Sequence, residues 1–505
     1  MTSAPSMRPM STPVPSQDTV AATGPADDPV GSHAAGPMAL RGSALRSTGY
    51  AVTIGLSLIS APLLIRHLGI AGFGRYTTVL AIVAIVSGLT DAGLVSIALR
   101  EWTTRAGKNR ARLMRSLLGI RCELSLGGVA IGVAFALLAG YDRTLVLGTL
   151  IAGVGIVLQA VANVLTVPLQ GELRFGWASL IDVARQAVAV ALIVALVIAG
   201  ASLLPFFAVS IPAGLVTLVF TAVLVRGKMP LSPRFRGAEL WPLVRDVLPY
   251  SAAIALNALY FRVTIIVMSL TATAQQTGYF ATSFKVIEVL IGIPGLAIQA
   301  AFPILSRAAL EDRQRFASAT ERILELALIA GTGLVLVVVL SAPFVIAVLA
   351  GASGAPAVPV LQIQGLALVA TFLAAASGYS LLSLRRHHAL LIANSAALVA
   401  NIALTLVLVP IDQARGAAIA AVIAESCLAL GQLILLLSSG AVRMRLASLP
   451  AVAVAGLAGA APLLVAGMEP VLRALLGLAI YLSVLALLGR LPPEVAHALG
   501  RRQLR

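Results

Sequence analysis

Long apolar stretches recur along this chain and restrict the folds that are open to it. Fourteen windows of about 20 mostly apolar residues lie between positions 47 and 489, and about 20 such residues carry a helix across roughly 30 Å of hydrocarbon. Backbone polar groups in lipid must pair within their own segment, and the windows lack the alternation of barrel strands. We therefore expect an all-α integral membrane protein with about 14 transmembrane helices.

The composition agrees with a lipid environment. Apolar residues make up 59% of the chain and charged residues 11%, whereas a soluble protein carries roughly 25% charged residues. Burial inside a globule cannot hide so much apolar surface, because interior volume outgrows surface only slowly. The predicted helices lie at 47–65, 77–99, 117–139, 144–166, 179–199, 203–225, 247–270, 279–302, 323–349, 358–383, 389–409, 415–438, 447–466 and 471–489.

Basic residues are distributed unevenly among the loops that join these helices. If the N-terminus is cytoplasmic, the loops on its side hold 27 of the 36 Lys and Arg residues, the opposite loops hold 5, and 4 lie inside helices. Loops rich in Lys and Arg are retained in the cytoplasm, so we expect both termini on that side of a cell membrane. The net charge of +16 forms no stripe interleaved with aromatic residues, and we therefore expect no nucleic-acid partner.

The chain reads as two halves of similar design. Gly74, Arg75 and Tyr76 open the second predicted helix, and Gly278 and Tyr279 open the eighth in the same way. Helices one to six and seven to twelve then form two pseudo-symmetric six-helix lobes, an arrangement that encloses a central cavity in many transporters. We expect the N-lobe at 41–246 and the C-lobe at 247–440.

The two ends of the chain differ from the lobes. Residues 1–40 are rich in Ser, Thr, Pro, Ala and Gly and contain no apolar run long enough for a signal peptide. They lack the apolar surface that would offset the loss of chain entropy, so we expect a disordered cytoplasmic tail. Residues 441–505 are predicted to add helices thirteen and fourteen and a short cytoplasmic tail.

Signatures of catalysis are absent from the sequence. Gly227 and Lys228 lack the adjoining Ser or Thr and the upstream glycine of a phosphate-binding loop. His387 and His388 lie in a basic turn and belong to no constellation of metal ligands. We therefore expect a protein that is not an enzyme and that holds no metal and no cofactor.

Three charged residues lie inside the seventh and eighth predicted helices, where a central charge costs about 2.5 to 3.5 kcal/mol on insertion scales. Arg262 lies about 12 Å from the outer end of its helix, and Lys285 and Glu288 lie about 9 and 13 Å from theirs, at 1.5 Å per residue. The three side chains are therefore predicted to meet at one level. They form either a cationic substrate-binding cavity with one net positive charge, or an Arg262–Glu288 ion pair with Lys285 extended toward the membrane surface.

Two carboxylates elsewhere in the predicted helices have a structural role or a role in ion coupling. Asp91 is predicted to pair with Arg100 or Arg121, which favours the structural role. Glu425 in the twelfth helix has no evident partner in the sequence. Glu425 is therefore a candidate for binding a proton or a cation. The coupling ions that we consider are Na⁺ and H⁺.

Two further pairs of opposite charge lie near the ends of predicted helices. Arg121 and Glu123 lie near the cytoplasmic end of the third predicted helix, and Asp182 and Arg185 lie near that of the fifth. Long charged side chains near helix ends reach the membrane interface, where they find partners. We expect both pairs to be structural.

Short motifs occur at corresponding places in the two halves, within residues 43–440. In the first half they are Arg66-His67-Leu68-Gly69-Ile70-Ala71-Gly72-Phe73-Gly74-Arg75-Tyr76, Asp91-Ala92-Gly93-Leu94 and Arg100-Glu101. In the second half they are Tyr260-Phe261-Arg262, Gly278-Tyr279-Phe280-Ala281, Lys285-Val286-Ile287-Glu288 and Phe302-Pro303-Ile304-Leu305-Ser306-Arg307. The motifs resemble those of the bacterial polysaccharide flippases, the oligosaccharide-lipid translocases of the multidrug/oligosaccharidyl-lipid/polysaccharide (MOP) superfamily.

This resemblance implies a MATE-like bundle of twelve to fourteen helices in the bacterial cytoplasmic membrane. It also implies that the protein flips a polyprenyl-diphosphate-linked oligosaccharide across that membrane, with Arg262, Lys285 and Glu288 in contact with the substrate. Membrane lipids, a polysaccharide polymerase and glycosyltransferases are the partners that it implies. Family members often have an Asp shortly after the Arg of helix seven, where this chain has Val263 and Thr264, and a carboxylate-dependent step there is in doubt.

Two other functions compete with flipping. A small-molecule exporter of the same superfamily, driven by Na⁺ or H⁺, would have a cavity centred on carboxylates rather than on Arg and Lys. A membrane-embedded glycosyltransferase or polymerase would need large loops outside the membrane, whereas the longest link between the predicted helices is about 20 residues. We therefore expect a flippase, with the exporter as the first alternative.

Overall fold

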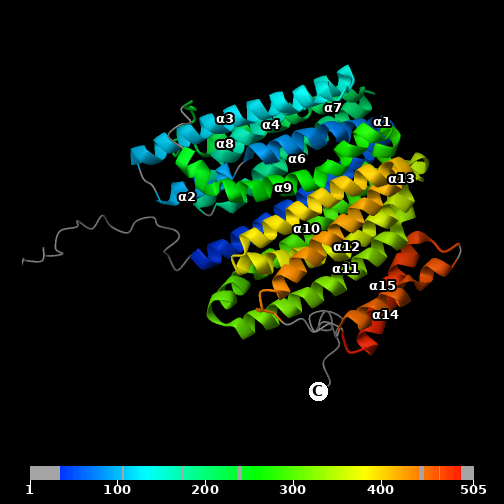
Figure 1. The fold of residues 1–505 in the computed structure, drawn as a ribbon. Coiled ribbons are helices and arrows are strands. Elements are labelled where there is room, and N and C mark those ends of the chain that lie inside the picture. The colour runs from blue at the N-terminus through cyan, green and yellow to red at the C-terminus, as the bar shows by residue number, and fades with distance from the viewer. Residues whose placement is uncertain are drawn as a thin grey trace, which may run out of the picture.

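The computed structural model describes residues 35–91, 93–104, 107–172, 174–235, 241–442, 448–465 and 467–490. Helices account for nearly all of these residues, and no strand occurs within the ranges given. The elements are α1 (Ala35–Asp91), α2 (Leu94–Thr104), α3 (Gly107–Leu138), α4 (Arg143–Leu165), α5 (Val167–Gly171), α6 (Phe175–Ile198), α7 (Leu203–Ala208), α8 (Ser210–Leu224), α9 (Trp241–Thr271), α10 (Ala274–Glu311), α11 (Arg313–Ala350), η2 (Gly351–Gly354), α12 (Ala357–Ser383), α13 (His387–Leu437), α14 (Leu449–Ala460), η4 (Ala461–Leu464) and α15 (Pro470–Leu487). Figure 1 labels most of these helices.

The long helices α1 and α13 each cover two predicted helices, because the backbone turns inside them. Gly69 interrupts α1 with φ 69° and ψ 170°, a conformation that a residue without a Cβ adopts at little cost. The break in α13 falls at Asp412 and Gln413, where Gln413 has φ 46°. Both breaks lie between predicted windows. Each of the fourteen windows falls largely on helix in the described residues.

Length and hydropathy indicate which helices are able to cross a membrane. Among the described residues, nine helices are long and apolar enough, and Ala258–Thr271 and Leu449–Leu464 are shorter apolar helices. α10, which carries Lys285 and Glu288, is not among the nine. The number of membrane crossings therefore stays a prediction.

The N-terminal helix begins earlier than the sequence predicts. The predicted tail extends to residue 40, whereas α1 begins at Ala35, because this stretch contains Ala, Met and Leu, which are strong helix formers. The predictions for residues 1–34 and for residues 491–505 lie outside the described part of the chain.

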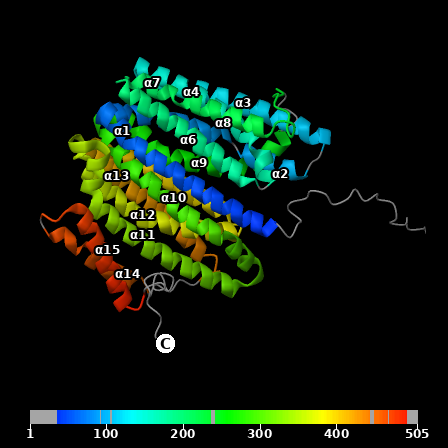
Figure 2. The ribbon, with the colours of Figure 1, turned by 180° about the vertical axis from the view of Figure 1, so that it is seen from behind.

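The helices pack into two groups that meet along α1. On one side of α1 lie α3, α4, α6 and α8, and on the other lie α10 to α13 (Figures 1 and 2). α9 contacts both α1 and α13. This grouping follows chain order, and we call the two groups the N-lobe (α1–α8) and the C-lobe (α9–α13). The predicted boundaries at 246 and 440 stay predictions.

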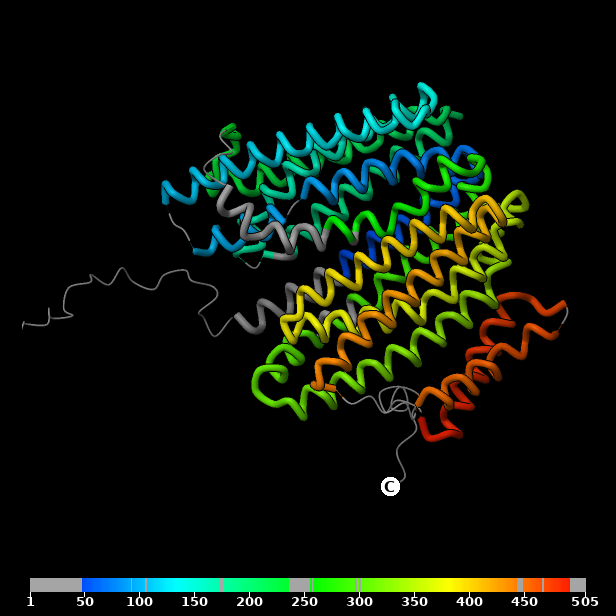
Figure 3. The backbone as a smooth tube through the Cα atoms, in the orientation of Figure 1, coloured from blue at the N-terminus to red at the C-terminus, as the bar shows by residue number. Residues whose placement is uncertain are grey.

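The last two helices pack on the flank of the C-lobe that faces away from the N-lobe. α14 and α15 lie against α11, as the tube in Figure 3 shows. The buried hydroxyl group of Tyr481 donates a hydrogen bond of 2.8 Å to the carbonyl oxygen of Ile329. Leu336, Leu340 and Val452 belong to the apolar cluster around it. These contacts connect the C-terminal pair to the C-lobe.

A close helix crossing joins the lobes at one end of the bundle. Gly74 of α1 lies against Gly278 of α10, and a Cβ added to Gly74 would lie 2.7 Å from the backbone nitrogen of Gly278. At the same end Arg66 of α1 donates hydrogen bonds of 3.0 and 2.7 Å to the carbonyl oxygens of Ala347 and Val348 in α11. We call this end of the bundle the crossing end. The charge distribution among the loops predicts that it faces outward.

Candidate functional site

A cavity of about 540 Å³ lies between the two lobes. Residues of α1, α4, α6, α7 and α8 form its N-lobe wall, and residues of α9 and α10 form its C-lobe wall. Four of the described lining residues are charged: Arg185, Arg262, Lys285 and Glu288. The described lining therefore carries three cations and one anion, all of them within helices.

Glu288 contacts both cations of the C-lobe wall. One of its carboxylate oxygens pairs with the guanidinium group of Arg262, and the other lies 2.9 Å from Nζ of Lys285. The three side chains are 29–31% exposed. The guanidinium carbon of Arg262 also lies 5.9 Å from the ring centre of Phe284, within the range of a cation–π contact. The meeting of the three charges that was predicted from their depth is observed.

The position of Lys285 differs from the one that the ion-pair interpretation gave it, while binding of substrate by this cluster stays a prediction. If Lys285 only extended to the membrane surface, it would leave Glu288 to Arg262 and would not line a cavity. Instead it contacts Glu288 across one helical turn and lines the cavity. One carboxylate therefore faces two cations, which leaves one net positive charge on the C-lobe wall.

The N-lobe wall adds neutral polar groups and one further cation. Ser57 and Ser60 of α1, Gln159 of α4 and Gln186 of α6 line it together with Arg185. Serine hydroxyl and glutamine amide groups both donate and accept hydrogen bonds. This wall is therefore able to bind hydroxyl groups of a polar ligand.

Arg185 is a site residue that the sequence reasoning missed. It was expected to pair with Asp182 near the membrane interface, but no ion pair joins these two residues, and Arg185 lines the cavity while Asp182 is exposed. The Nε atom of Arg185 is buried and has no hydrogen-bond partner. Its spacing from Asp182 favoured a local pair, whereas the packing of α6 against α1 turns Arg185 into the space between the lobes.

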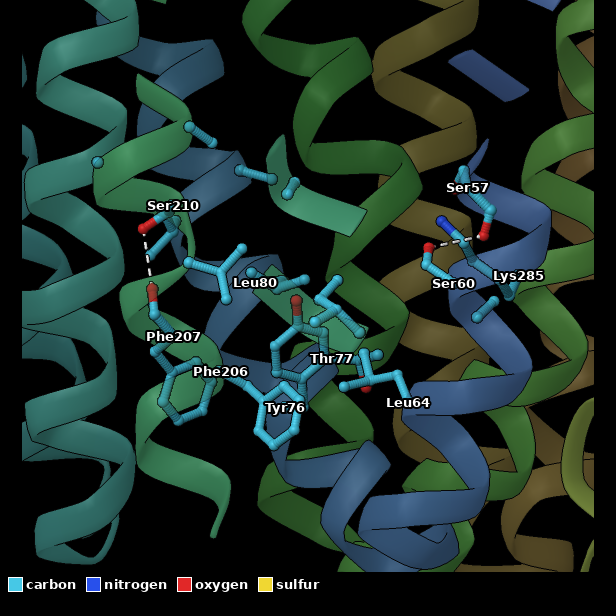
Figure 4. A pocket seen from close by; sticks show the side chains of 18 of the residues that line it. Ser57, Ser60, Leu64, Tyr76, Thr77, Leu80, Phe206, Phe207, Ser210 and Lys285 are labelled. Carbon is cyan, nitrogen blue, oxygen red and sulfur yellow. Dashed lines mark hydrogen bonds between the residues drawn. The ribbon is translucent and has the colours of Figure 1, made fainter. Parts of the chain in front are cut away.

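The end of the cavity nearer to the crossing end is aromatic. The rings of Tyr76 and Phe207 stack with their centres 5.6 Å apart, and Phe206 lies next to them in α7. Figure 4 shows these three side chains on one side of the cavity and Ser57, Ser60 and Lys285 on the other. The cavity is therefore apolar at one end and polar and charged at the other.

Asp91 belongs to a different part of the N-lobe. Its carboxylate lies 3.0 Å from Nη2 of Arg121, whose Nη1 donates a hydrogen bond of 2.5 Å to the carbonyl oxygen of Thr90. Arg121 belongs to α3 and is 1% exposed, Asp91 is the last residue of α1, and neither partner lines the central cavity. Asp91 thus pairs with Arg121 rather than with Arg100, and the expected Arg121–Glu123 pair does not form.

Glu425 lies in a second, small cavity inside the C-lobe. This cavity has a volume of about 40 Å³. Glu425 is 7% exposed and lines this cavity together with Tyr260 and Thr371. Asn401 lines the same cavity and accepts a hydrogen bond of 3.2 Å from Thr264. The polar residues that share this cavity with Glu425 are thus uncharged.

Several solved structures share this arrangement of helices. A lipid II flippase MurJ in its inward closed conformation matches with a TM-score of 0.73 and 14% identity over 90% of this chain and 100% of that one. A multidrug resistance MATE family transporter of the MOP superfamily in an inward-facing conformation gives 0.61 and 15% over 79% and 98%. A MOP superfamily transporter from Pyrococcus furiosus Vc1 (DSM3638) gives 0.58 and 17% over 80% and 95%.

The fold is therefore that of the MOP superfamily of membrane transporters, and the predicted all-α, MATE-like membrane fold is confirmed. A family model described as "Polysaccharide biosynthesis protein" matches residues 39–309, more than half of the chain. The protein belongs to this polysaccharide biosynthesis family, as the motifs in its two halves predict. No curated protein matches its sequence.

Proposed function

We propose that this protein flips a polyprenyl-diphosphate-linked oligosaccharide across the cytoplasmic membrane, for the synthesis of a surface polysaccharide. The observation that carries this proposal is the cationic cavity between the lobes, where Arg262 and Lys285 share the single carboxylate of Glu288. Membership of the polysaccharide biosynthesis family supports the class of substrate. The protein acts as a transporter and not as an enzyme.

The diphosphate group is the part of such a substrate that cannot cross hydrocarbon unaided. Charged groups at the centre of a bilayer cost several kcal/mol even on the mildest scales, about 2.5 to 3.5 kcal/mol per charge. Cationic side chains in a polar cavity lower this barrier by replacing the water that the phosphates lose. Arginine suits this role because its planar guanidinium group forms paired hydrogen bonds with phosphate oxygens.

The remaining parts of the substrate fit the other surfaces of the cavity. The serine and glutamine side chains of the N-lobe wall offer hydrogen bonds to sugar hydroxyl groups. Stacked aromatic rings such as Tyr76 and Phe207 suit the apolar face of a sugar ring. The polyprenyl chain stays in the lipid while the two lobes rock about the cavity, which opens it to one side of the membrane and then to the other.

The second cavity, inside the C-lobe, is the proposed site at which transport is coupled to an ion gradient. Glu425 is the acidic residue of that cavity, and it is surrounded by the neutral ligands Tyr260, Thr371 and Asn401. Oxygen ligands of this kind suit Na⁺, and a buried carboxyl group suits H⁺. We propose that one of these two ions binds at Glu425 and drives the motion of the lobes.

The distribution of charge argues against the alternative of a small-molecule exporter. An exporter of organic cations needs a free carboxylate in its central cavity. Glu288, the acidic residue of the described lining, is already paired with two cations. Resistance to drugs conferred on a host that lacks efflux pumps would favour the exporter.

The proposed function is tested with charge-removing variants of the C-lobe wall. Arg262→Ala, Lys285→Ala and the double variant are expressed in a host whose own copy is deleted, and surface glycan is measured at equal protein abundance. We expect each single variant to lower glycan output and the double variant to abolish it. Arg307→Ala and Lys108→Ala remove exposed cations and are the matched controls. Normal output from the double variant would refute the proposal.

The proposed orientation and partners have their own tests. The uneven distribution of Lys and Arg supports cytoplasmic termini, so reporter fusions at successive loops should alternate between the two sides of the membrane. Membrane lipids surround the helices, and a polysaccharide polymerase and glycosyltransferases are the proposed protein partners. Cross-linking in intact cells should recover such enzymes with the flippase.

A further inference from the structure

Arg185 has a chemical environment that its own lobe does not explain. It lies in α6, in the interior of the bundle, and lines the central cavity. Its Nε atom is buried without a hydrogen-bond partner, and no ion pair joins Arg185 to another described residue. A guanidinium group placed at the centre of a helix in lipid costs about 2.5 to 3.5 kcal/mol on insertion scales. An unpaired arginine here therefore does not stabilise the fold.

The neighbours of Arg185 on the N-lobe wall cannot neutralise it. Gln159, Gln186, Ser57 and Ser60 are among the polar described residues of this wall, and all four are uncharged. The one described carboxylate of the cavity, that of Glu288, already contacts Arg262 and Lys285 in the other lobe. No carboxylate of the described residues is therefore paired with Arg185, and an anionic ligand in the cavity would supply its counter-ion.

The cations of the two walls lie at similar depths. His67 of α1 contacts the carbonyl oxygen of Ala201 at 2.8 Å, which places the loop after α6 at the crossing end, where α10 also begins. Counted from the helix ends at that side, Arg185 lies thirteen residues from Ile198 and Lys285 eleven residues from Ala274. These separations correspond to roughly 20 Å and 16 Å along the helices.

The charges of the cavity match a diphosphate that is esterified at both ends. Such a group carries one negative charge on each phosphate. Three cations and one carboxylate give the described lining a net charge of +2. The C-lobe wall alone supplies +1, which is enough for a single phosphate, and the second positive charge is that of Arg185.

We propose that Arg185 is a second anion-binding residue and that the diphosphate of the substrate bridges the N-lobe and the C-lobe. This inference rests on the proposed function and deepens it. When the cavity is empty, Arg185 and the net positive charge of the C-lobe wall repel each other across it. When the diphosphate binds, it joins the two walls, so the arrangement of the lobes depends on whether substrate is present.

The inference is tested by comparing a diphosphate probe with a monophosphate probe on the purified full chain in lipid nanodiscs. The probes are geranylgeranyl diphosphate and geranylgeranyl monophosphate, and calorimetry gives their dissociation constants. We expect Arg185→Gln to weaken binding of the diphosphate about ten- to hundred-fold, because a charge-assisted hydrogen bond is lost. Binding of the monophosphate should weaken much less, because it has no second phosphate to span the two walls. Arg143→Gln removes an exposed arginine of the same lobe and is the matched control.

A second variant keeps the test decisive if Arg185→Gln does not fold. Arg185→Lys retains the charge but loses the paired hydrogen bonds of the guanidinium group, so it should weaken diphosphate binding several-fold. Equal affinity of wild type and both variants for the diphosphate would overturn the inference. If Lys285→Gln still weakened binding in that case, the proposed function would stand without Arg185. If Lys285→Gln and Arg262→Gln also bound the probe normally, the proposed function would fail with it.

Discussion

Gly74 of α1 and Gly278 of α10 meet at a crossing that leaves no room for a side chain on either helix. A Cβ added to Gly278 would collide with the carbonyl group of Ile70, and one added to Gly74 would lie 2.7 Å from the nitrogen of Gly278. Real Cβ atoms essentially never approach other atoms closer than 3.0 Å. The same two glycines open corresponding helices in the two halves of the sequence, so the internal repeat becomes a direct contact between the lobes.

A side chain at this crossing should push the lobes apart. Gly278→Val places its methyl groups against backbone, which cannot move aside as a flexible side chain would, and overpacking of this kind costs about 1 to 3 kcal/mol. We expect a lower melting temperature and a longer distance between spin labels on Arg143→Cys and Arg415→Cys. Both labels lie on exposed positions, and the native Cys122 and Cys427 are replaced by Ser in this background.

The control for this prediction is Gly55→Ala in α1, the helix that carries Gly74. A Cβ at Gly55 would meet nothing within 4 Å, and alanine favours helix over glycine by about 1 kcal/mol. Gly55→Ala should therefore leave the distance between the labels unchanged and the melting temperature unchanged or higher. An unchanged distance in Gly278→Val would show that the crossing does not hold the lobes together.

The Arg121–Asp91 pair should be structural. Arg121→Met leaves the partly exposed carboxylate of Asp91 and the carbonyl oxygen of Thr90 without this partner, and an unsatisfied polar group of this kind costs about 1 to 3 kcal/mol. We expect a marked fall in melting temperature and in abundance, measured by fluorescence-detected chromatography. Glu123→Gln changes an exposed neighbour on the same helix and should have no effect. Normal stability of Arg121→Met with low glycan output would instead assign this pair to transport.

The sequence predicts helices and some charge contacts well, because both depend on local spacing. Apolar windows define helices wherever the solvent is lipid, and the breaks at Gly69 and Gln413 fall between windows. The contact between Lys285 and Glu288 follows from their spacing of three residues. The contact of Arg262 with Glu288 follows from depth. The predicted ends of the seventh and eighth helices place these two residues at the same level of one helical hairpin.

Contacts that depend on helix rotation could not be predicted in this way. Asp91 had two candidate partners, and the packing of α3 against α1 selects Arg121. Arg185 had a candidate partner at the correct spacing, but α6 presents Arg185 to the other lobe. Gln159 carried no signal at all, because a neutral polar residue in an apolar window costs less than a charge and so stands out less.

Glu425 should matter for coupling and not for substrate binding. Its carboxyl group lies in the small cavity inside the C-lobe, apart from the charged residues of the central cavity. Glu425→Gln should therefore lower glycan output and remove its dependence on a Na⁺ or H⁺ gradient, while the affinity for geranylgeranyl diphosphate stays at the wild-type value. Cys427→Ser changes an exposed residue of the same helix and is the control. Ion dependence that survives in Glu425→Gln would place the coupling site elsewhere.

Glu288 competes with the anionic ligand for Arg262 and Lys285. Removal of its charge should therefore strengthen ligand binding and, at the same time, slow transport. Glu288→Gln keeps the shape of the side chain and a carbonyl oxygen that accepts hydrogen bonds, but it raises the net charge of the described lining from +2 to +3. We expect geranylgeranyl diphosphate to bind roughly tenfold more tightly, which corresponds to about 1.4 kcal/mol. Release of the substrate then becomes slower, so glycan output should fall. Weaker binding in Glu288→Gln would show that Glu288 chiefly positions the two cations, and its melting temperature, measured alongside, separates that outcome from a loss of folding.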